Sequence, residues 1–298
     1  MSSKNSHYKN LSEKWTAKHK EVQNTVWTKH KEAFSWLANT LSPKQLIAGS
    51  LGGIMLLAQP ATVLLPAPHL LLEAQHKMAG ELDSNTKLVI DLWNIVPVEM
   101  RSFSEEEEQK ITETLNHHFG FRVSAELSGI RLNRNYGYIG AEQHLMLYPG
   151  DSIYTHFDSD QEANLYASIG MAPGLGAWGY FAQSKEQLTQ KDRDKEKYYI
   201  AVQTFLSPGF YDNVKKYNEF YKYLKMLVIN PHTGRSIITV VGDAGPGQLT
   251  GKHLGGSPEV MKYLERQDGN RKGPVLYFFI DDPKDLIPLG PISDTIKL

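Results

Sequence analysis

The sequence predicts an α+β protein whose C-terminal half is mainly β, preceded by a small α+β unit and an N-terminal helical and membrane segment. Three observations predict this organisation. Runs of β-branched and aromatic residues recur after residue 197, a capping-box helix begins near residue 104, and a long uncharged run precedes both. The segments that follow from these observations are 1–44, 45–72, 86–150, 170–283 and 284–298.

The composition excludes several classes of site. The chain has 298 residues, with 32 Lys and Arg against 33 Asp and Glu, and it has no cysteine. Without a thiol there is no disulfide, no thiolate metal ligand and no cysteine nucleophile. The balanced charge gives no basic field of the kind that binds nucleic acid, so no nucleic-acid partner is expected.

Residues 1–44 predict a basic amphipathic helix. They hold eight Lys and no Arg against three Glu, and the sequence Ala-Lys-His-Lys-Glu at 17–21 recurs as Thr-Lys-His-Lys-Glu at 28–32. Apolar residues keep the same eleven-residue step, which is close to a whole number of helical turns. Such a helix suits an anionic membrane surface, and a solvated helix or a coiled-coil partner is an equal alternative.

Residues 45–72 contain no Asp, Glu, Lys or Arg and predict a hydrophobic signal or membrane anchor. Residues 46–65 alone match the hydrocarbon thickness of a bilayer. Lysines before this run and acids after it place the N-terminus in the cytoplasm and the rest of the chain outside. The expected location is therefore extracytoplasmic, either anchored or secreted after signal cleavage. The alternative is a cytosolic protein in which this run belongs to the core.

The small α+β unit is predicted over residues 86–150. Residues 87–96 alternate apolar side chains, which predicts a strand. Ser104 with Glu107 forms a capping box, so a helix is predicted from there to Gly120. Two further strands are predicted over residues 121–127 and 130–139.

No metal ion or other cofactor is expected from the sequence. Glu113 and His117 have a spacing that can bind zinc, but a solvated helix face accounts for it. His144 is expected to make an ordinary polar contact. Residues 156–162 alternate oxygen-bearing side chains as calcium loops do, but they lack the central glycine of those loops.

The C-terminal half is predicted as strands separated by turns. Residues 198–202 predict a strand, and the charged tract over 185–197 before it predicts an exposed loop. A tyrosine-rich helical insertion is predicted over residues 207–225. Near the C-terminus, residues 275–280 predict a buried closing strand, and an extended surface tail follows.

The stretch from residue 227 to 264 is the centre of this half. Two β-branched runs flank a turn of Asn, Pro and Gly, which predicts a hairpin. The second run enters a glycine-rich loop over residues 242–247, in which Asp243 is the one carboxylate. Ser257, Pro258 and Glu259 then open a short helix.

This order of hairpin, carboxylate loop and capped helix resembles the RlpA-like double-psi β-barrel family, which groups with expansins, barwin-like proteins and the MltA lytic transglycosylases. The resemblance implies a double-psi β-barrel over residues 170–283, in which residues 174–182 take the position of the family's first strand. The chain departs from the family pattern at Gly255 and Gly256, where the family has Asp and Leu before the serine. The matching residues are Val228, Asn230, Gly234, Arg235, Ser236, Val240, Asp243, Gly245, Pro246, Gly251, Lys252 and Ser257.

The resemblance also implies a cell-wall protein that acts on peptidoglycan glycan strands. Asp243 falls on the aspartate that lytic transglycosylases of the family use as acid and then base. The family's histidine is missing, because Val202, Gln203 and Thr204 stand at its place. A single carboxylate suits lytic cleavage, in which the substrate's own hydroxyl closes a 1,6-anhydro ring, better than hydrolysis, which uses two. The alternative is a non-catalytic, expansin-like module that binds polysaccharide or protein.

Aromatic and polar residues expected near Asp243 are the candidate substrate-binding groups. An aromatic side chain on a barrel strand is otherwise a core residue, so each of these has a structural alternative. The expected partner is peptidoglycan or another cell-wall polysaccharide, with membrane contact through residues 46–65. The candidates are Trp178, Tyr180, Gln248, Thr250, Lys252 and His253.

Overall fold

A computed structural model describes residues 83–266 and 272–292. The basic helix predicted over 1–44 and the anchor predicted over 45–72 lie outside these residues. Across the part of the chain that is described, no helix combines the length and apolar character that a bilayer crossing requires.

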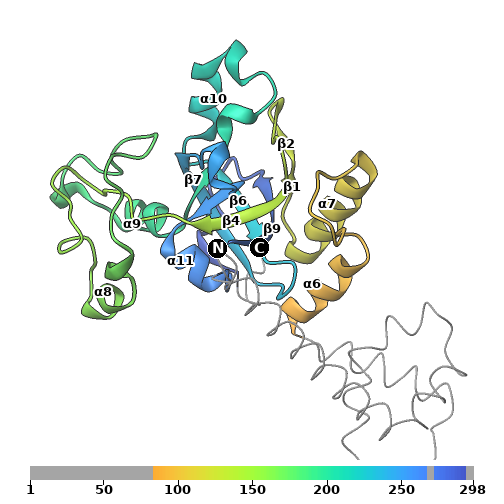
Figure 1. The fold of residues 1–298 in the computed structure, drawn as a ribbon, viewed down its shortest axis with the longest axis horizontal. Coiled ribbons are helices and arrows are strands. Elements are labelled where there is room, and N and C mark those ends of the chain that lie inside the picture. The colour runs from red at the N-terminus through yellow and green to blue at the C-terminus, as the bar shows by residue number, and fades with distance from the viewer. Residues whose placement is uncertain (1–82, 267–271, 293–298) are drawn as a thin grey trace, which may run out of the picture. The chain divides into compact units, whose positions relative to one another are not determined.

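Six strands close into a mixed β-barrel at the centre of Figure 1. Around the barrel the order is β9, β4, β8, β5, β7, β6 and back to β9. The pairs β4–β8 and β5–β7 are parallel, and the other four pairs are antiparallel. The strands are β4 (Tyr136–Ala141), β5 (Tyr199–Val202), β6 (Lys225–Ile229), β7 (Ser236–Ala244), β8 (Leu254–Gly256) and β9 (Lys272–Ile280).

Alternation along the strands separates the barrel interior from its outer face. Successive side chains point to opposite faces of a strand. On β6, Met226 and Val228 join a cluster to which all six barrel strands contribute, whereas Leu227 and Ile229 join a second cluster outside. All four are fully buried, so both faces of β6 are covered.

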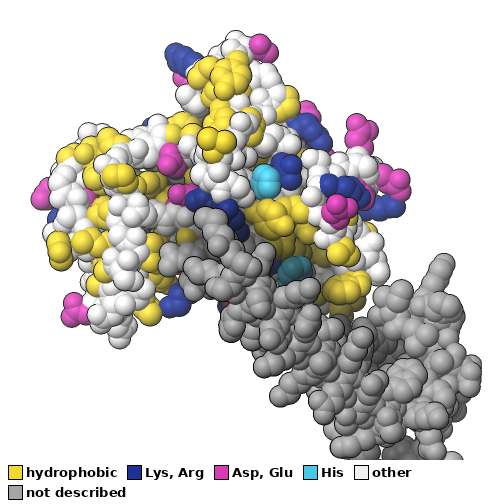
Figure 2. Space-filling view, in the orientation of Figure 1, with side chains coloured by type: hydrophobic (Ala, Val, Ile, Leu, Met, Phe, Trp, Pro, Cys, Tyr) yellow, Lys and Arg dark blue, Asp and Glu magenta, His cyan; other side chains and the backbone are white. Residues whose placement is uncertain are grey.

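The outer cluster is covered by α6 (Ser84–Trp93) and α7 (Glu105–Phe119), which lie next to each other on one flank of the barrel (Figure 1). Ile111 and Leu115 of α7 are buried in it. The capping box at Ser104 and the left-handed Gly120, with φ of 74°, confirm both predicted ends of α7. On the face drawn in Figure 2, acidic and basic side chains alternate over this region.

The strand predicted over residues 87–96 is wrong, because the segment forms α6. Leu88, Ile90 and Leu92 alternate as in a strand, but Leu88 and Leu92 are also one helical turn apart. Those two are buried, whereas Ile90 is 46% exposed. The carboxylate of Asp83 caps the helix by accepting a hydrogen bond from the backbone N–H of Thr86 at 3.1 Å.

The strands predicted over residues 121–127 and 130–139 form only in part. β1 (Val123–Ser124) extends the sheet at β9. β2 (Glu126–Leu127) and β3 (Ile130–Arg131) make a separate two-stranded hairpin. Its turn residues Ser128 and Gly129 both have positive φ, which matches the twist of tight hairpins. β4, which lies in the predicted small unit, is a strand of the barrel.

The segment between β4 and β5 differs most from prediction. Residues 174–182 form turns and bends, so the strand predicted there is wrong. The exposed loop predicted over 185–197 is also wrong, because a second capping box at Thr189 starts a helix that buries Glu196. The elements here, on the flank opposite α7 in Figure 1, are α8 (Asp160–Tyr166), η1 (Ala167–Ile169), η2 (Lys185–Gln187) and α9 (Gln190–Lys197).

The predicted helical insertion after β5 is confirmed. Tyr217 and Tyr221 pack against the barrel interior, whereas Tyr211 is exposed. The hydroxyl of Tyr221 lies 2.6 Å from Oγ of Ser207, which pairs a buried polar group. The insertion contains η3 (Thr204–Leu206), η4 (Phe210–Asp212) and α10 (Val214–Tyr221).

The hairpin and short helix predicted within residues 227–264 are confirmed as β6, β7 and α11 (Pro258–Tyr263). Gly234 in the turn has φ of 71°, and a Cβ there would meet the backbone oxygen of Asn85 at 2.1 Å. Only glycine therefore allows α6 to approach the hairpin this closely. The predicted closing strand is β9, and β10 (Gly290–Pro291) pairs with β7.

Candidate functional site

Asp243 lies near the end of β7 and is half-buried. Its Oδ1 accepts hydrogen bonds from the backbone N–H groups of Ala177, at 2.6 Å, and Ala244, at 2.8 Å. Its Oδ2 has no hydrogen-bond partner among the described residues. The carboxylate is thus fixed by one oxygen, and no residue in the described ranges bonds to the other.

The loop after Asp243 is held by the end of β5. The backbone N–H of Gly245 donates to the carbonyl of Val202 at 2.9 Å. The buried side chain of Gln203 donates to the carbonyl of Pro246, also at 2.9 Å. Gln203, which stands near the place of the family's histidine, therefore serves as a brace for the carboxylate loop.

Trp178 is brought close to Asp243 although no strand forms around it. Its indole N–H donates to the carbonyl of Val241 at 3.0 Å, and its ring packs against the interior cluster. The neighbouring Ala177 donates to Asp243, so the turn at 177–178 lies along β7. Tyr180, two residues further on, is half-buried.

The other candidate substrate-binding residues lie in the segment that joins β7 to β8. Gln248 and Thr250 are exposed on η5 (Gln248–Thr250). Nζ of Lys252 pairs with Oε1 of Glu142 at 2.6 Å. The ion pair ties Lys252 to the residue that follows β4, and the roles of all three residues as glycan ligands stay predictions.

His253 is tied to β4 rather than aimed at Asp243. Its Nδ1 accepts a hydrogen bond from the backbone N–H of Tyr138 at 3.0 Å, and its ring stacks on that of Tyr138 with centroids 6.0 Å apart. Burial, with a contribution from Arg134, lowers the pKa of His253, so the neutral ring is favoured.

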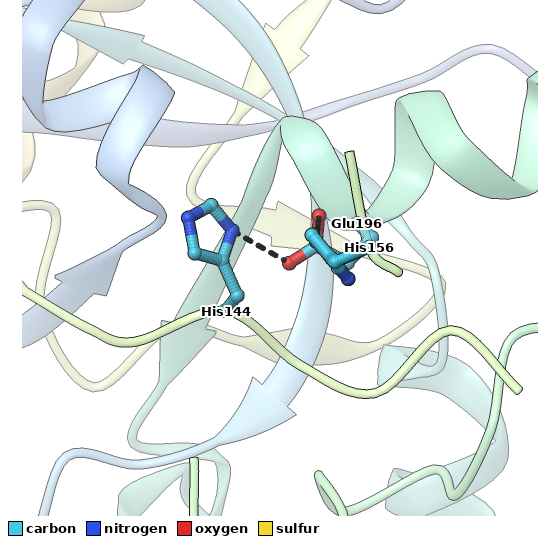
Figure 3. A group of neighbouring side chains, drawn as sticks. All are labelled: His144, His156 and Glu196. Carbon is cyan, nitrogen blue, oxygen red and sulfur yellow. Dashed lines mark hydrogen bonds and ion pairs between the residues drawn. The ribbon is translucent and has the colours of Figure 1, made fainter. Parts of the chain in front are cut away.

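A second polar site lies between β4, the following loop and α9. We call it the histidine–carboxylate cluster, and it consists of His144, Asp151, His156 and Glu196. All four residues are buried. Figure 3 shows His144 and His156 on either side of Glu196, which projects from the last turn of α9.

Hydrogen bonds connect three members of the cluster. Nδ1 of His156 lies 2.8 Å from Oδ2 of Asp151, and its Nε2 lies 3.2 Å from Oε2 of Glu196. Oε1 of Glu196 accepts from the backbone N–H of Leu145 at 3.0 Å. Nδ1 of His144 is 3.4 Å from the same Oε1, but neither ring nitrogen of His144 has hydrogen-bond geometry to any described residue.

The cluster shifts the pKa values of its members. Burial opposes the charged form of His156, but its bonds to Asp151 and Glu196 outweigh burial and raise its pKa to about 10. Burial likewise opposes the charged form of Glu196, and the two histidines outweigh it and lower the pKa of this carboxyl to about 2. In the absence of any ion, His156 is thus a cation between two carboxylates.

Glu259, at the start of α11, borders the same region. Burial, strengthened by the charge of Glu196, raises the pKa of Glu259 to about 7. Its Oε2 is buried and has no hydrogen-bond partner among the described residues. Glu259, His156 and Glu196 line one cavity of about 60 Å³.

The sequence pattern did not reveal this cluster. The charged residues that suggested a calcium loop point elsewhere: Asp158 pairs with Arg193 at 2.9 Å, and Glu162 with Lys197 at 2.6 Å. His144 makes a polar contact, as expected, because its Nδ1 lies 3.4 Å from Oε1 of Glu196, but the sequence did not point to that partner. Within the described ranges, His144, His156 and Glu196 are the only group whose ligand atoms, all within 4.8 Å of one another, could hold a metal ion.

Comparison of the chain with known proteins supplies no further guide to either site. No protein-family model matches the chain, and no curated protein matches it. Functional arguments for this chain therefore rest on the barrel, on Asp243 and on the histidine–carboxylate cluster.

Proposed function

We propose that the chain carries an RlpA-like double-psi β-barrel that acts on cell-wall glycan, cleaving peptidoglycan strands lytically with Asp243 as acid and base. The closed barrel of six strands, with two parallel pairs among antiparallel ones, is compatible with this proposal. The residues that carry the family resemblance lie on β6, β7, the loop after β7 and the cap of α11.

The observation that carries the proposal is the way Asp243 is held. Two backbone N–H groups fix Oδ1 of this half-buried side chain, whereas Oδ2 has no partner within the part of the chain that the structure describes. A catalytic acid needs this combination of fixed orientation and a free oxygen within reach of the substrate. The two amides belong to different segments, β7 and the 177–178 turn. Because they hold Oδ1 in place, they also set the direction in which Oδ2 points.

In the proposed reaction, Asp243 gives its proton to the glycosidic oxygen that leaves. The carboxylate then takes a proton from the hydroxyl at C6 of the same sugar, and this oxygen closes the 1,6-anhydro ring at C1. The C1–O bond to the leaving sugar breaks and a new C1–O bond forms, with no water consumed. One carboxylate is enough for this sequence, whereas hydrolysis uses a second one to activate water or attack the sugar.

A non-catalytic module that binds wall polysaccharide is the second candidate, and one observation favours it. Asp243, Trp178, Lys252 and His253 all make intramolecular bonds that would hold the barrel rim together without any substrate. A carboxylate that accepts backbone N–H bonds in a loop also has a purely structural use.

The test is incubation of the full-length chain with purified peptidoglycan, followed by mass spectrometry for anhydro-muropeptides. If the chain is a lytic enzyme, the wild type should form anhydro product and Asp243→Asn should not. Asp91→Asn, which changes an exposed acid on α6, is the matched control and should keep the activity. Binding to peptidoglycan without product in the wild type would instead support the module.

The proposed location is outside the cytoplasmic membrane, with residues 46–65 as anchor or signal. Fractionation of cells that express the full chain tests this part separately. Recovery in the membrane or extracytoplasmic fraction supports it. Recovery in the cytosolic fraction would favour the alternative in which residues 46–65 are part of the core.

A further inference from the structure

His144 is a buried polar group that no described residue satisfies with a hydrogen bond. The residue is fully buried, and both ring nitrogens lack a hydrogen-bond partner among the described residues. Buried polar atoms in native proteins almost always have a partner, so an exception calls for an explanation such as an ion or water. Nδ1 faces Oε1 of Glu196 at 3.4 Å, which places the unsatisfied ring in the histidine–carboxylate cluster.

His156 is oriented as metal-binding histidines are. Asp151 accepts from Nδ1–H of His156 at 2.8 Å, and Asp151 is itself held by the backbone N–H groups of Leu147 and Ser152, both at 2.9 Å. A carboxylate behind one ring nitrogen fixes the tautomer in which the other nitrogen carries a free lone pair. That other nitrogen, Nε2, faces Oε2 of Glu196 at 3.2 Å.

The spacing of these atoms suits one small cation. Zinc binds histidine nitrogen and carboxylate oxygen at about 2.0–2.2 Å, so its ligands lie about 3.3–3.5 Å from one another in a tetrahedron. One ligand atom from each of His144, His156 and Glu196 lies within 4.8 Å of the others. The two carboxylate oxygens of Glu196 each face one ring: Oε2 lies 3.2 Å from Nε2 of His156, and Oε1 lies 3.4 Å from Nδ1 of His144. The site would thus close around the ion with small side-chain movements.

The charge of the cluster also favours a divalent cation. With both imidazoles neutral, Asp151 and Glu196 leave two negative charges buried together, which is costly unless they are compensated. A divalent cation cancels both charges, whereas a proton on His156 cancels one. The chain has no cysteine, and two imidazoles with one carboxylate are a ligand set common to zinc sites.

We propose that His144, His156 and Glu196 bind one zinc ion, with Asp151 as the positioning residue behind His156. Three protein ligands leave a fourth position, as in zinc sites that hold a water molecule. The adjoining cavity of about 60 Å³ has room for that water, and Glu259 lines it with an oxygen that has no partner among residues 83–266 and 272–292. The proposal is independent of the glycan activity proposed for Asp243.

The test uses the full-length chain after removal of metal with a chelator, titrated with Zn²⁺ and measured by calorimetry and metal analysis. The wild type should bind one more equivalent of zinc than His144→Gln. Histidines elsewhere in the chain are the same in both proteins, so any binding by them cancels. His117→Gln, which changes an exposed histidine on α7, should retain the wild-type stoichiometry. Equal zinc binding by the wild type and His144→Gln would overturn the proposal.

Two further measurements keep the test decisive if His144→Gln does not fold. Asp151→Asn keeps all three ligands and should weaken zinc affinity 10- to 100-fold, which is the usual effect of removing a carboxylate behind a ligand histidine. Co²⁺ bound to the wild type should show the intense visible absorption of a four-coordinate ion. Unchanged affinity in Asp151→Asn, or the weak spectrum of six-coordinate Co²⁺, would contradict the proposed site.

Discussion

Two regions of the molecule gather polar side chains in opposite ways. One is the barrel rim, by which we mean Asp243, Trp178, Lys252 and His253, and the other is the histidine–carboxylate cluster. Asp243, its loop and the helix cap come from one continuous stretch, with the turn at 177–178 placed against it. The cluster draws on three separate segments, at residue 144, at 151–156 and at 196. A local pattern in the sequence can reveal the first kind of site, whereas the second exists only once the chain has folded.

The two regions also differ in how much stability rests on them. The members of the cluster are buried, and His156 bonds to both Asp151 and Glu196, so removing either carboxylate leaves a buried charge without a partner. The side chains at the rim are half-buried or exposed, and water can replace what a substitution removes. Substitutions in the cluster are therefore expected to cost more than substitutions at the rim.

Glu196→Ala should have the largest effect. It removes the carboxylate that accepts from His156 and from the backbone N–H of Leu145, both in the interior. Breaking a buried pair by removing one partner typically costs about 3–5 kcal/mol. Urea denaturation of the metal-free chain measures it, with Glu106→Ala on the exposed face of α7 as the control. A loss below about 1 kcal/mol, the range of exposed pairs, would show that the cluster is not a stabilising unit.

Glu259→Gln should have the next largest effect and should depend on pH. The folded pKa of Glu259 is about 7, above its ordinary value of 4.5, so the unfolded chain loses this proton first. The contribution of Glu259 therefore falls as pH rises from about 4.5 to about 7 and is constant above. At pH 8 and without metal, the free energy of unfolding of Glu259→Gln should exceed that of the wild type by on the order of 2–3 kcal/mol.

The measurement is the free energy of unfolding of wild type and Glu259→Gln across pH 4 to 8. The difference between the two should be small at pH 4 and should grow through neutral pH. A difference that does not change with pH would mean that the carboxyl of Glu259 finds a partner in solution. In that case the contrast between cluster and rim would rest on Glu196 and the two histidines alone.

The barrel was predictable where local pattern and final packing agree. The hairpin β6–β7, the cap of α11, both ends of α7 and the closing strand β9 follow from turn residues, caps and apolar runs. In each of these, the residues that determine the local conformation also face the core. The position of Asp243 at the end of the second hairpin strand was predictable for the same reason, and its catalytic role stays a prediction.

Prediction failed where tertiary contacts decide between local alternatives. Leu88 and Leu92 fit a strand or a helix, and only their burial under the outer face of the barrel selects α6. Residues 190–197 are almost entirely polar, so nothing in the pattern shows that Glu196 is buried against His144 and His156. No sequence spacing links these residues, since 12 positions separate the first two and 40 the last two.

Asp243→Ala should have a smaller effect on stability than Glu196→Ala in the cluster or Glu259→Gln beside it. The substitution leaves the N–H groups of Ala177 and Ala244 without their acceptor, but the site is half-buried and water can reach it. A loss of about 1–2 kcal/mol is expected, which is typical of hydrogen bonds to a charged group. Thermal or urea unfolding measures it, with Asp91→Ala as control. A loss equal to that of Glu196→Ala would erase the distinction between the two regions.

Lys252→Met should have the smallest effect, because its ion pair with Glu142 is close to solvent. The side chains of Lys252 and Glu142 are 17% and 28% exposed, and Nζ also donates to the carbonyl of Ala141 at 3.0 Å. Pairs with such access to water contribute about 0.2–1 kcal/mol, since solvent screens the charges. A double-mutant cycle with Glu142→Gln isolates the pair, and a coupling energy within this range is expected. A coupling energy of about 3 kcal/mol or more would show that water does not reach the pair. Lys252 would then brace β4 against the loop that carries Gln248 and Thr250, and a surface role in holding glycan would be excluded for it.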